Sequence, residues 1–229
     1  MGNNYLQNKQ KIIKNLTAVK NAFCAFKNAF SLGKNTDELF EVFKNSLDNE
    51  LGSYEILYDY IWGEDTAGID GVTKNYTPKI GDTAILDISV KFGGVWCDVT
   101  RTFFVGEPTK EQVIRYEMLK RAMKNGESAL KSGVKACDIY NAVNSVYLKN
   151  GYNLVHHAGH KILTDAVMQP QFLPENNAFI ESGNFYTLEP GVYKDFGIRI
   201  ENDYLVTDGG AQNLFEDLMP LDIKEYILK

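Results

Sequence analysis

Apolar residues recur at nearly helical spacing over residues 8–31, and this pattern predicts a helix that ends at Gly33. The next segment, DELFEVFKNSLDNEL, has the same periodicity, so we expect a second helix that Thr36 caps and Gly52 ends. The first part of the chain is therefore predicted to be a pair of helices joined at a glycine.

The same arrangement returns one hundred residues later. Thr109 and Gln112 form a predicted capping box, and the helix that follows them ends at Gly133. A further helix, ACDIYNAVNSVYLKN, ends at Gly151. The shared order and apolar phase suggest an internal duplication, in which one domain is built from two similar halves.

Two β-rich runs follow each pair of helices. TAILDISVKF and VWCDVTRTFFV flank Gly93-Gly94, a good hairpin signal, and NFYTLEPGVY and GIRIENDYLVT flank a turn near Asp195 and Gly197. Helices and antiparallel hairpins in this order predict an α+β fold. Because no Pro/Ser-rich linker interrupts the chain, we expect residues 1–229 to form a single domain.

The composition is typical of a globular protein, with 44% hydrophobic and 24% charged residues in 229. A net charge of -6 argues against nucleic acid and anionic membrane as partners, and no apolar run approaches the roughly 20 residues of a membrane span. Cys24, Cys97 and Cys137 are far apart and odd in number, which favours inert thiols in a reducing cytoplasm over a disulfide framework.

Four carboxylates interrupt the apolar strands, namely Asp87, Asp98, Glu189 and Glu201. If the two glycines make a two-residue turn, Asp87 pairs with Thr100, and Asp87 and Asp98 become diagonal neighbours on one face, about 7 Å apart between backbones. Glu189 and Glu201 have a similar spacing across the second turn. The duplication would therefore place four carboxylates around a pseudo-twofold axis.

Four clustered negative charges would repel one another and raise their pKa values unless cations balance them. Two divalent ions, with an imidazole from His156, His157 or His160 as a further ligand, would suit the set. Mostly carboxylate ligation favours Mn²⁺, with Zn²⁺, Fe²⁺ and Co²⁺ as alternatives. The simpler alternative is that each acid forms a salt bridge, for which Arg101 and Arg199 are available.

At these residues the chain resembles the pita-bread metallopeptidases, which include methionine aminopeptidases, prolidases, aminopeptidases P and creatinases. The resemblance covers nearly the whole chain and is strongest in LDISV, CDVTRTFF, GHKIL, YTLEPGVY and IRIENDYLVT, closest to the prolidase and aminopeptidase P branch. It implies a curved antiparallel sheet covered by helices, present here as the catalytic domain alone. The family's five metal ligands correspond to Asp87, Asp98, His160, Glu189 and Glu201.

The resemblance also implies an enzyme, a hydrolase of the Xaa-Pro dipeptidase or aminopeptidase type that cleaves an N-terminal peptide bond. Glu189 would be the general base, taking a proton from a water that bridges the two metal ions and becomes the attacking hydroxide. His156 matches a substrate-contacting histidine of the family, and Thr100 and Arg199 would orient the carboxylates. His157 has no counterpart in the family, so we expect it to be a surface or core residue.

Two positions depart from the family. It has a histidine 17 or 18 residues before the first aspartate ligand, where Ile69 or Asp70 stands here, and another seven residues after the histidine ligand, where Val167 stands. Each lost hydrogen-bond donor would cost roughly 10²–10³ in rate.

Three alternatives stay open: an Xaa-Pro peptidase of ordinary, weak or altered activity, an enzyme acting on another C–N bond or small molecule, and a non-catalytic binding protein. We expect a peptide or small molecule as partner, and a homodimer is left open.

Overall fold

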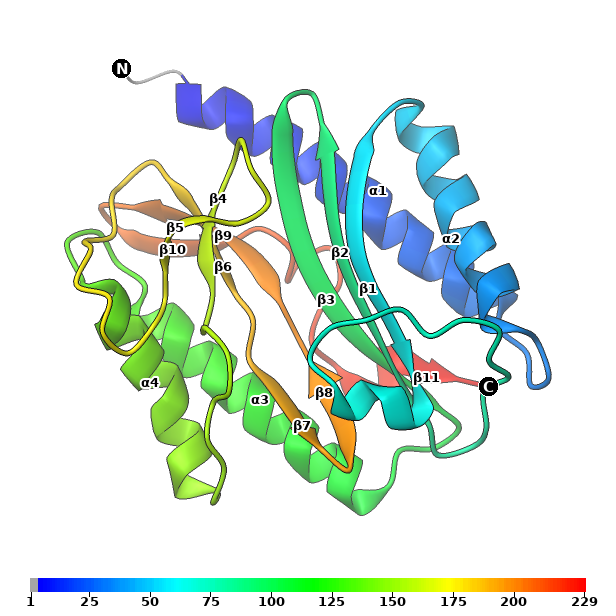
Figure 1. The fold of residues 1–229 in the computed structure, drawn as a ribbon. Coiled ribbons are helices and arrows are strands. Elements are labelled where there is room, and N and C mark those ends of the chain that lie inside the picture. The colour runs from blue at the N-terminus through cyan, green and yellow to red at the C-terminus, as the bar shows by residue number, and fades with distance from the viewer. Residues whose placement is uncertain (1–3) are drawn as a thin grey trace.

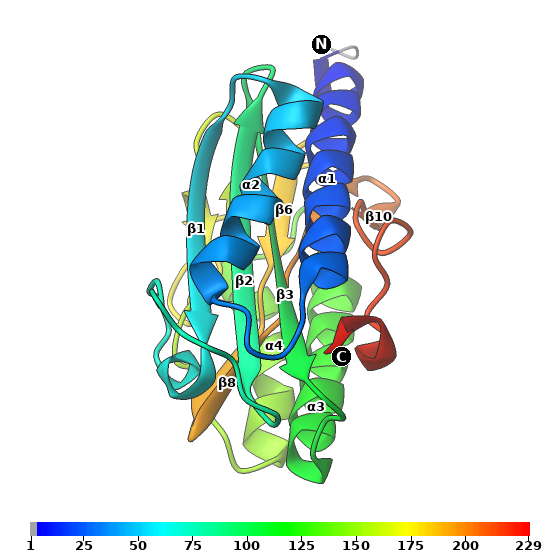
Figure 2. The ribbon, with the colours of Figure 1, turned by 90° about the vertical axis from the view of Figure 1, so that its right-hand side faces the viewer.

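The structure is a computed structural model and describes residues 4–229. Its helices are α1 (Asn4–Ala29), α2 (Thr36–Leu51), α3 (Lys110–Ala129) and α4 (Ala136–Lys149), with the 3-10 helices η1 (Gly63–Ala67) and η2 (Ile223–Tyr226). The strands are β1 (Glu55–Trp62), β2 (Thr83–Phe92), β3 (Val95–Val105), β4 (His160–Ile162), β5 (Met168–Gln171), β6 (Phe185–Leu188), β7 (Gly191–Lys194), β8 (Phe196–Arg199), β9 (Asn202–Thr207), β10 (Gly210–Asn213) and β11 (Ile227–Leu228). Helices α1, α2 and α3 lie behind the strands in Figure 1, as the turned view in Figure 2 shows.

The four predicted helices are all present. The capping box of Thr109 and Gln112 is confirmed at the start of α3. The predicted cap of α2 is wrong, because the side chain of Asn35 accepts the hydrogen bond from the Asp37 backbone N–H and Thr36 is the first helical residue. Within residues 4–229, no helix combines the length and the apolar character that crossing a membrane requires.

The first predicted hairpin is confirmed in its register. β2 and β3 span the two predicted runs, and Asp87 lies opposite Thr100. β1 and β11, which the sequence analysis did not predict, extend this hairpin to a sheet of order β1-β2-β3-β11. Helix α1 packs on the sheet through Phe23 and Phe26, whose ring centroids lie 5.9 and 5.2 Å from that of Phe103.

The second pair of predicted strands is wrong in one respect, because each run is interrupted beside its acid. Glu189 and Pro190 separate β6 from β7, and Glu201 lies between β8 and β9. Pro190 has no N–H for a strand ladder, and the Glu201 N–H donates to the Thr100 carbonyl of β3 at 3.0 Å. The strands form a sheet of order β10-β9-β6-β4-β5 and a separate β7-β8 hairpin, which turns at Asp195.

The two halves meet where β3 lies beside β8 and β9. The Thr102 hydroxyl donates to the Arg199 carbonyl at 2.8 Å and accepts from the Arg199 N–H at 3.0 Å. The Asp203 carboxylate accepts from the Asp98 N–H at 3.1 Å. These contacts bring the acids of both halves to one side of the strands, opposite α1 and α2.

Candidate metal centre

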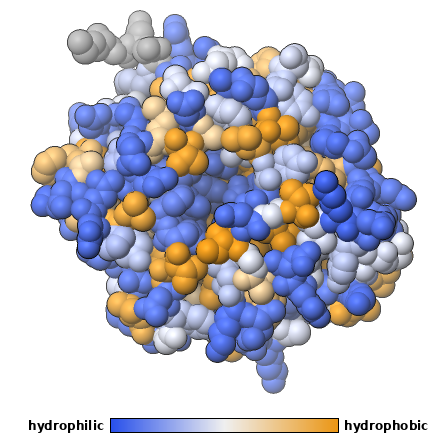
Figure 3. Space-filling view, in the orientation of Figure 1, coloured by the Kyte–Doolittle hydropathy of each residue, from blue (hydrophilic) through white to orange (hydrophobic). Residues whose placement is uncertain are grey.

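A cavity of about 350 Å³ opens among the acids of the two halves. Figure 3 shows a hydrophilic hollow near the middle of this face, bordered by hydrophobic residues. Leu57, Tyr58 and Val167 are exposed apolar residues of the cavity wall. Six carboxylates also line it, those of Asp59, Asp70, Asp87, Asp98, Glu189 and Glu201. A second hollow, of about 460 Å³ beside Tyr5 and Gly183, has one carboxylate in its wall and no histidine, so the first is the place for metal chemistry.

Asp98, His160 and Glu201 form a close group, with ligand atoms that all lie within 4.8 Å of one another, and His156, His157 and Glu189 form a second group that is equally close by this measure. The His160 Nε2 atom is 3.6 Å from Asp98 Oδ2 and 4.0 Å from Glu201 Oε1. All three side chains are buried, yet Asp98 Oδ1 and Glu201 Oε1 have no hydrogen-bonding partner. Buried carboxylate oxygens without a partner are unfavourable, so the residues present fit a divalent cation.

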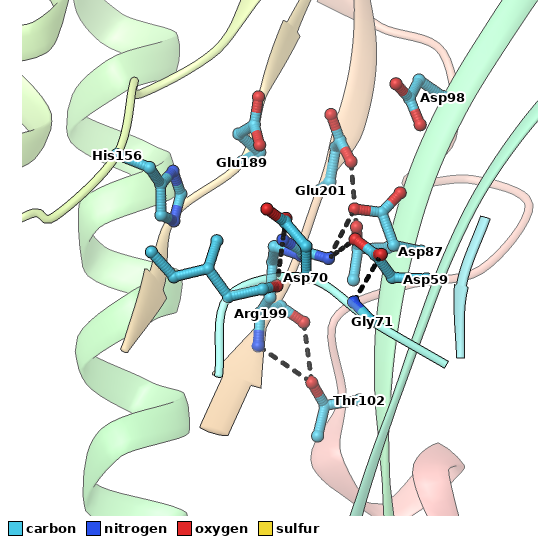
Figure 4. A network of polar contacts seen from close by, with 12 residues as sticks. Asp59, Asp70, Gly71, Asp87, Asp98, Thr102, His156, Glu189, Arg199 and Glu201 are labelled. Carbon is cyan, nitrogen blue, oxygen red and sulfur yellow. Dashed lines mark hydrogen bonds and ion pairs between the residues drawn. The ribbon is translucent and has the colours of Figure 1, made fainter. Parts of the chain in front are cut away.

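Glu189 and Asp87 lie beside this group (Figure 4). Glu189 Oε1 is 3.6 Å from His160 Nε2. Asp87 instead contacts a cation of the protein, because its Oδ2 atom is 2.8 Å from Nη2 of Arg199. The structure therefore brings all five predicted ligands to one cavity, three of them within direct reach of one ion. Their role as ligands stays a prediction.

His160 is held by a close approach of two backbones. The preceding Gly159 has a φ of 151°, and a side chain there would overlap the Thr187 carbonyl oxygen. The His160 N–H donates to the Thr187 hydroxyl at 3.3 Å, and Nδ1 contacts the Lys161 carbonyl oxygen at 3.0 Å. This leaves Nε2 of His160 to face the carboxylates, as a ligand requires.

Burial among like charges shifts three of the four predicted acids in the expected direction. Burial, followed by the charge of a neighbouring carboxylate, raises the pKa of Asp98 and of Glu201 well above their usual values. Burial raises the pKa of Asp87 to about 6, although the charge of Arg199 opposes the rise. At neutral pH a metal ion would therefore compete with protons for these oxygens.

Glu189 behaves differently, so the expectation of a raised pKa is wrong for this residue. Burial alone would raise its pKa, but the close contact and charge of His157, together with the charges of His160 and His156, outweigh burial and lower the pKa to about 2. Burial likewise lowers the pKa of His157, and the contact with Glu189 outweighs it and raises that pKa. Glu189 is thus the acid of this set that is held ionised without a metal ion.

Thr100 and Arg199 make the contacts that orienting the carboxylates would require. The Thr100 hydroxyl donates to Glu201 Oε2 at 2.9 Å. Nη2 of Arg199 lies 2.8 Å from Asp59 Oδ2 as well as from Asp87, so Asp59 is a partner that the sequence analysis missed. Its only signal was an aspartate inside the apolar run EILYDYIW. Arg101, the other proposed salt-bridge partner, instead donates to the Glu201 backbone carbonyl at 2.8 Å.

The two neighbouring histidines differ from the prediction. The expected surface or core role of His157 is wrong, because its ring lines the cavity and its Nδ1 lies 2.9 Å from Glu189 Oε1. His156 does not line the described cavity. Its Nδ1 contacts the His157 carbonyl at 2.7 Å and its Nε2 the Tyr193 hydroxyl at 3.1 Å. A substrate contact of His156, still a prediction, would require one of these bonds to be exchanged.

The residues that replace the family's histidines differ in whether they reach the cavity. Asp70 and Val167 line it, and Ile69 does not. The Ile69 carbonyl accepts a hydrogen bond from Nη1 of Arg199 at 3.1 Å, which holds the loop against the site. The departures of the sequence therefore change the wall of the cavity that a substrate would meet.

Known proteins match most of this chain. Residues 10–208 match metallopeptidase family M24. The Xaa-Pro dipeptidase of Pyrococcus furiosus is 29% identical over 148 residues, which are 63% of this chain and 42% of that protein. A putative dipeptidase of Bacillus subtilis is 32% identical over 155 residues, 66% of this chain and 43% of that protein. The chain thus spans less than half the length of these relatives.

Solved structures share the fold. A prolidase from Pyrococcus furiosus has a TM-score of 0.84 at 24% identity, covering 89% of this chain and 62% of that one. A variant of Escherichia coli aminopeptidase P has a TM-score of 0.83 at 17% identity, covering 95% of this chain and 57% of that one. The predicted pita-bread fold is confirmed, and the chain belongs to metallopeptidase family M24.

Proposed function

We propose that the protein is a dinuclear metal-dependent peptidase of the Xaa-Pro dipeptidase or aminopeptidase type, which hydrolyses an N-terminal peptide bond. One observation carries the proposal: the ligand atoms of Asp98, His160 and Glu201 lie within 4.8 Å of one another in a cavity that Asp87 and Glu189 also line. Membership in family M24 and a relative named Xaa-Pro dipeptidase support the reaction class. Residues 1–229 would form its single catalytic domain.

In this proposal the five predicted ligands hold two ions, with Mn²⁺ preferred by a carboxylate-rich set. When bound, the ions would polarise the scissile carbonyl and acidify a water molecule. The Glu189 carboxylate takes a proton from the attacking water and passes it to the leaving nitrogen. The Thr100 hydroxyl fixes Oε2 of Glu201, and the Arg199 guanidinium fixes Oδ2 of Asp87. His156 would approach the scissile carbonyl only when its bond to Tyr193 opens.

Elemental analysis and a dipeptide panel test the proposal. We expect two Mn²⁺ ions per chain and Mn²⁺-dependent hydrolysis of Xaa-Pro dipeptides. Glu189→Gln should abolish this hydrolysis. Asp208→Asn makes the same change from carboxylate to carboxamide at an exposed position in a turn, and it should leave the hydrolysis unchanged. A metal-loaded protein that cleaves no Xaa-Pro peptide would contradict the proposal.

A second candidate is hydrolysis of another C–N bond by the same metal centre. Asp70 and Val167 favour it, because both line the cavity where the family's histidines are expected. Turnover of a non-peptide in a broad substrate screen would support it. Protein that binds no metal even after Mn²⁺ addition would instead support a binding protein.

We also propose a cytoplasmic setting, since the three cysteines are free.

A further inference from the structure

His157 faces the proposed metal centre although no family resemblance assigns it a role. Its ring lines the cavity, and its centroid lies 5.5 Å from that of His160. Its Nδ1 is 2.9 Å from Glu189 Oε1, the same oxygen that lies 3.6 Å from His160 Nε2. One carboxylate oxygen is thus shared between a predicted metal ligand and an additional imidazole.

The backbone fixes this arrangement. The Glu189 N–H donates to the Ala158 carbonyl at 3.0 Å, and the Ala158 N–H donates to the Phe172 carbonyl at 2.9 Å. The segment that carries His157 is therefore bound on one side to Glu189 and on the other to the strand end at Phe172. His156, one residue earlier, points to Tyr193 instead. The side chain of His157 consequently has Glu189 as its neighbour.

The polar atoms of the pair also complement each other. Nδ1 of His157 and Oε1 of Glu189 are both buried, and neither has a hydrogen-bonding partner in the structure, although the two atoms lie only 2.9 Å apart. We propose that His157 is a positioning residue for Glu189, whose Oε1 accepts a hydrogen bond from Nδ1–H and is thereby aimed at the metal centre. This inference rests on the proposed function. Carboxylates that ligate metals are commonly oriented by such a second hydrogen bond.

The tautomer separates this role from that of the missing family histidines. A neutral ring that donates from Nδ1 presents Nε2 to the cavity as an acceptor. In this neutral form it supplies no hydrogen bond to a developing oxyanion, which is the contribution expected to be lost at Val167 and at Ile69 or Asp70. His157 acts through Glu189 and does not replace those donors.

Two substitutions at His157 test the proposal, because one keeps an N–H donor and the other does not. His157→Asn keeps an N–H donor near the place of Nδ1, and His157→Leu keeps a similar size without a donor. Calorimetric titration with Mn²⁺ should give two ions per chain in every case. We expect the Leu variant to bind them roughly 10–100-fold more weakly than wild type and the Asn variant to recover most of the loss. Val155→Asn, at an exposed position two residues earlier, is the matched control and should bind as wild type.

Two further measurements distinguish this inference from the proposed function. With an Xaa-Pro dipeptide, His157→Leu should lower kcat while KM stays nearly constant, and His157→Asn should restore kcat. The electron paramagnetic resonance spectrum of bound Mn²⁺ should change in the Leu variant and resemble wild type in the Asn variant. The same Mn²⁺ affinity, kcat and spectrum in His157→Asn and His157→Leu would overturn the positioning role. Loss of one ion in both variants would also overturn it, because it would show that His157 is a metal ligand. If the wild-type protein binds two ions but cleaves no peptide, only the proposed function is refuted. The Mn²⁺ titration and the spectrum would still test the role of His157.

Discussion

The two halves of the molecule present their acids in different ways. Asp87 and Asp98 lie within the unbroken strands β2 and β3, where the pleat alone turns them to one face. Glu189 and Glu201 lie at breaks between shorter strands. In the first half, the register of a regular hairpin places the two aspartates on one face. In the second half, the backbone leaves the strand pairing beside each glutamate, and the Glu201 N–H donates to the Thr100 carbonyl instead.

Each half also orients an acid of the other. Thr100 of the first half donates to Glu201, and Arg199 of the second half binds Asp87. The Asp203 carboxylate accepts from the backbone N–H of Asp98 in the same reciprocal sense. The proposed metal centre would therefore be complete only when the two halves pack together.

Removal of a ligand from the regular half should have the largest effect. Asp98→Asn removes one predicted ligand from the group of Asp98, His160 and Glu201, so we expect Mn²⁺ affinity to fall by more than the roughly 10–100-fold typical of orienting residues. Titration calorimetry measures this, with Asp208→Asn as the exposed control. Retention of two tightly bound ions in Asp98→Asn would show that this half contributes no ligand there.

Breaking the reciprocal contacts should have an intermediate effect. Thr100→Val removes the hydrogen bond to Glu201. Arg199→Lys replaces a guanidinium group, whose Nη2 contacts both Asp59 and Asp87, with a single ammonium group. Each should weaken Mn²⁺ binding by roughly 10–100-fold. Because both acids belong to one cluster, the two free-energy changes should couple and not simply add in the double variant. Unchanged affinity in either single variant would argue against cross-positioning.

Restoring a family histidine should have a smaller, positive effect. Val167→His puts an imidazole back into the cavity wall, and we expect a rise of about 10-fold in kcat/KM for an Xaa-Pro dipeptide, below the full contribution of such a donor. Val155→His, exposed and outside this cavity, is the control. A rise in the control, or none at Val167, would favour a substrate other than a peptide.

The smallest expected effect is the pH dependence of the metal-free protein. Asp87 has its pKa raised from 3.8 to about 6, so its stabilising contribution is complete below pH 3.8 and is lost as pH rises through 6. Glu189 has its pKa lowered from 4.5 to about 2, so its contribution is complete above pH 4.5 and is lost as pH falls through 2. Between pH 4.5 and 6 the thermal midpoint in chelator should therefore fall as pH rises, by roughly 2–4 °C per kcal/mol.

Calorimetry in chelator follows this change, and Asp87→Asn should flatten it. Saturating Mn²⁺ should reverse the slope, because ions bind the ionised carboxylates. The same pH slope in wild type and in Asp87→Asn would contradict the assigned shift of Asp87.

Much of the first half could be predicted from local sequence. Apolar periodicity and glycines define the helices, and the Gly93-Gly94 turn fixes the register that sets Asp87 opposite Thr100. The second half was predicted less well, because its strand breaks depend on a hydrogen bond from Glu201 to a strand one hundred residues away. The role of Asp59 was missed for the same reason, since Arg199 is 140 residues distant.

The sequence by itself determined the four helices and the first hairpin, because turn chemistry and periodicity act over a few residues, and the family resemblance gave the order of the five candidate ligands. Only the tertiary structure decided which of two adjacent histidines faces the cavity. A loop has no fixed period that would assign His156 and His157 to opposite sides. Their directions follow from backbone bonds of Ala158 to Glu189 and Phe172, which exist only once the second half has folded.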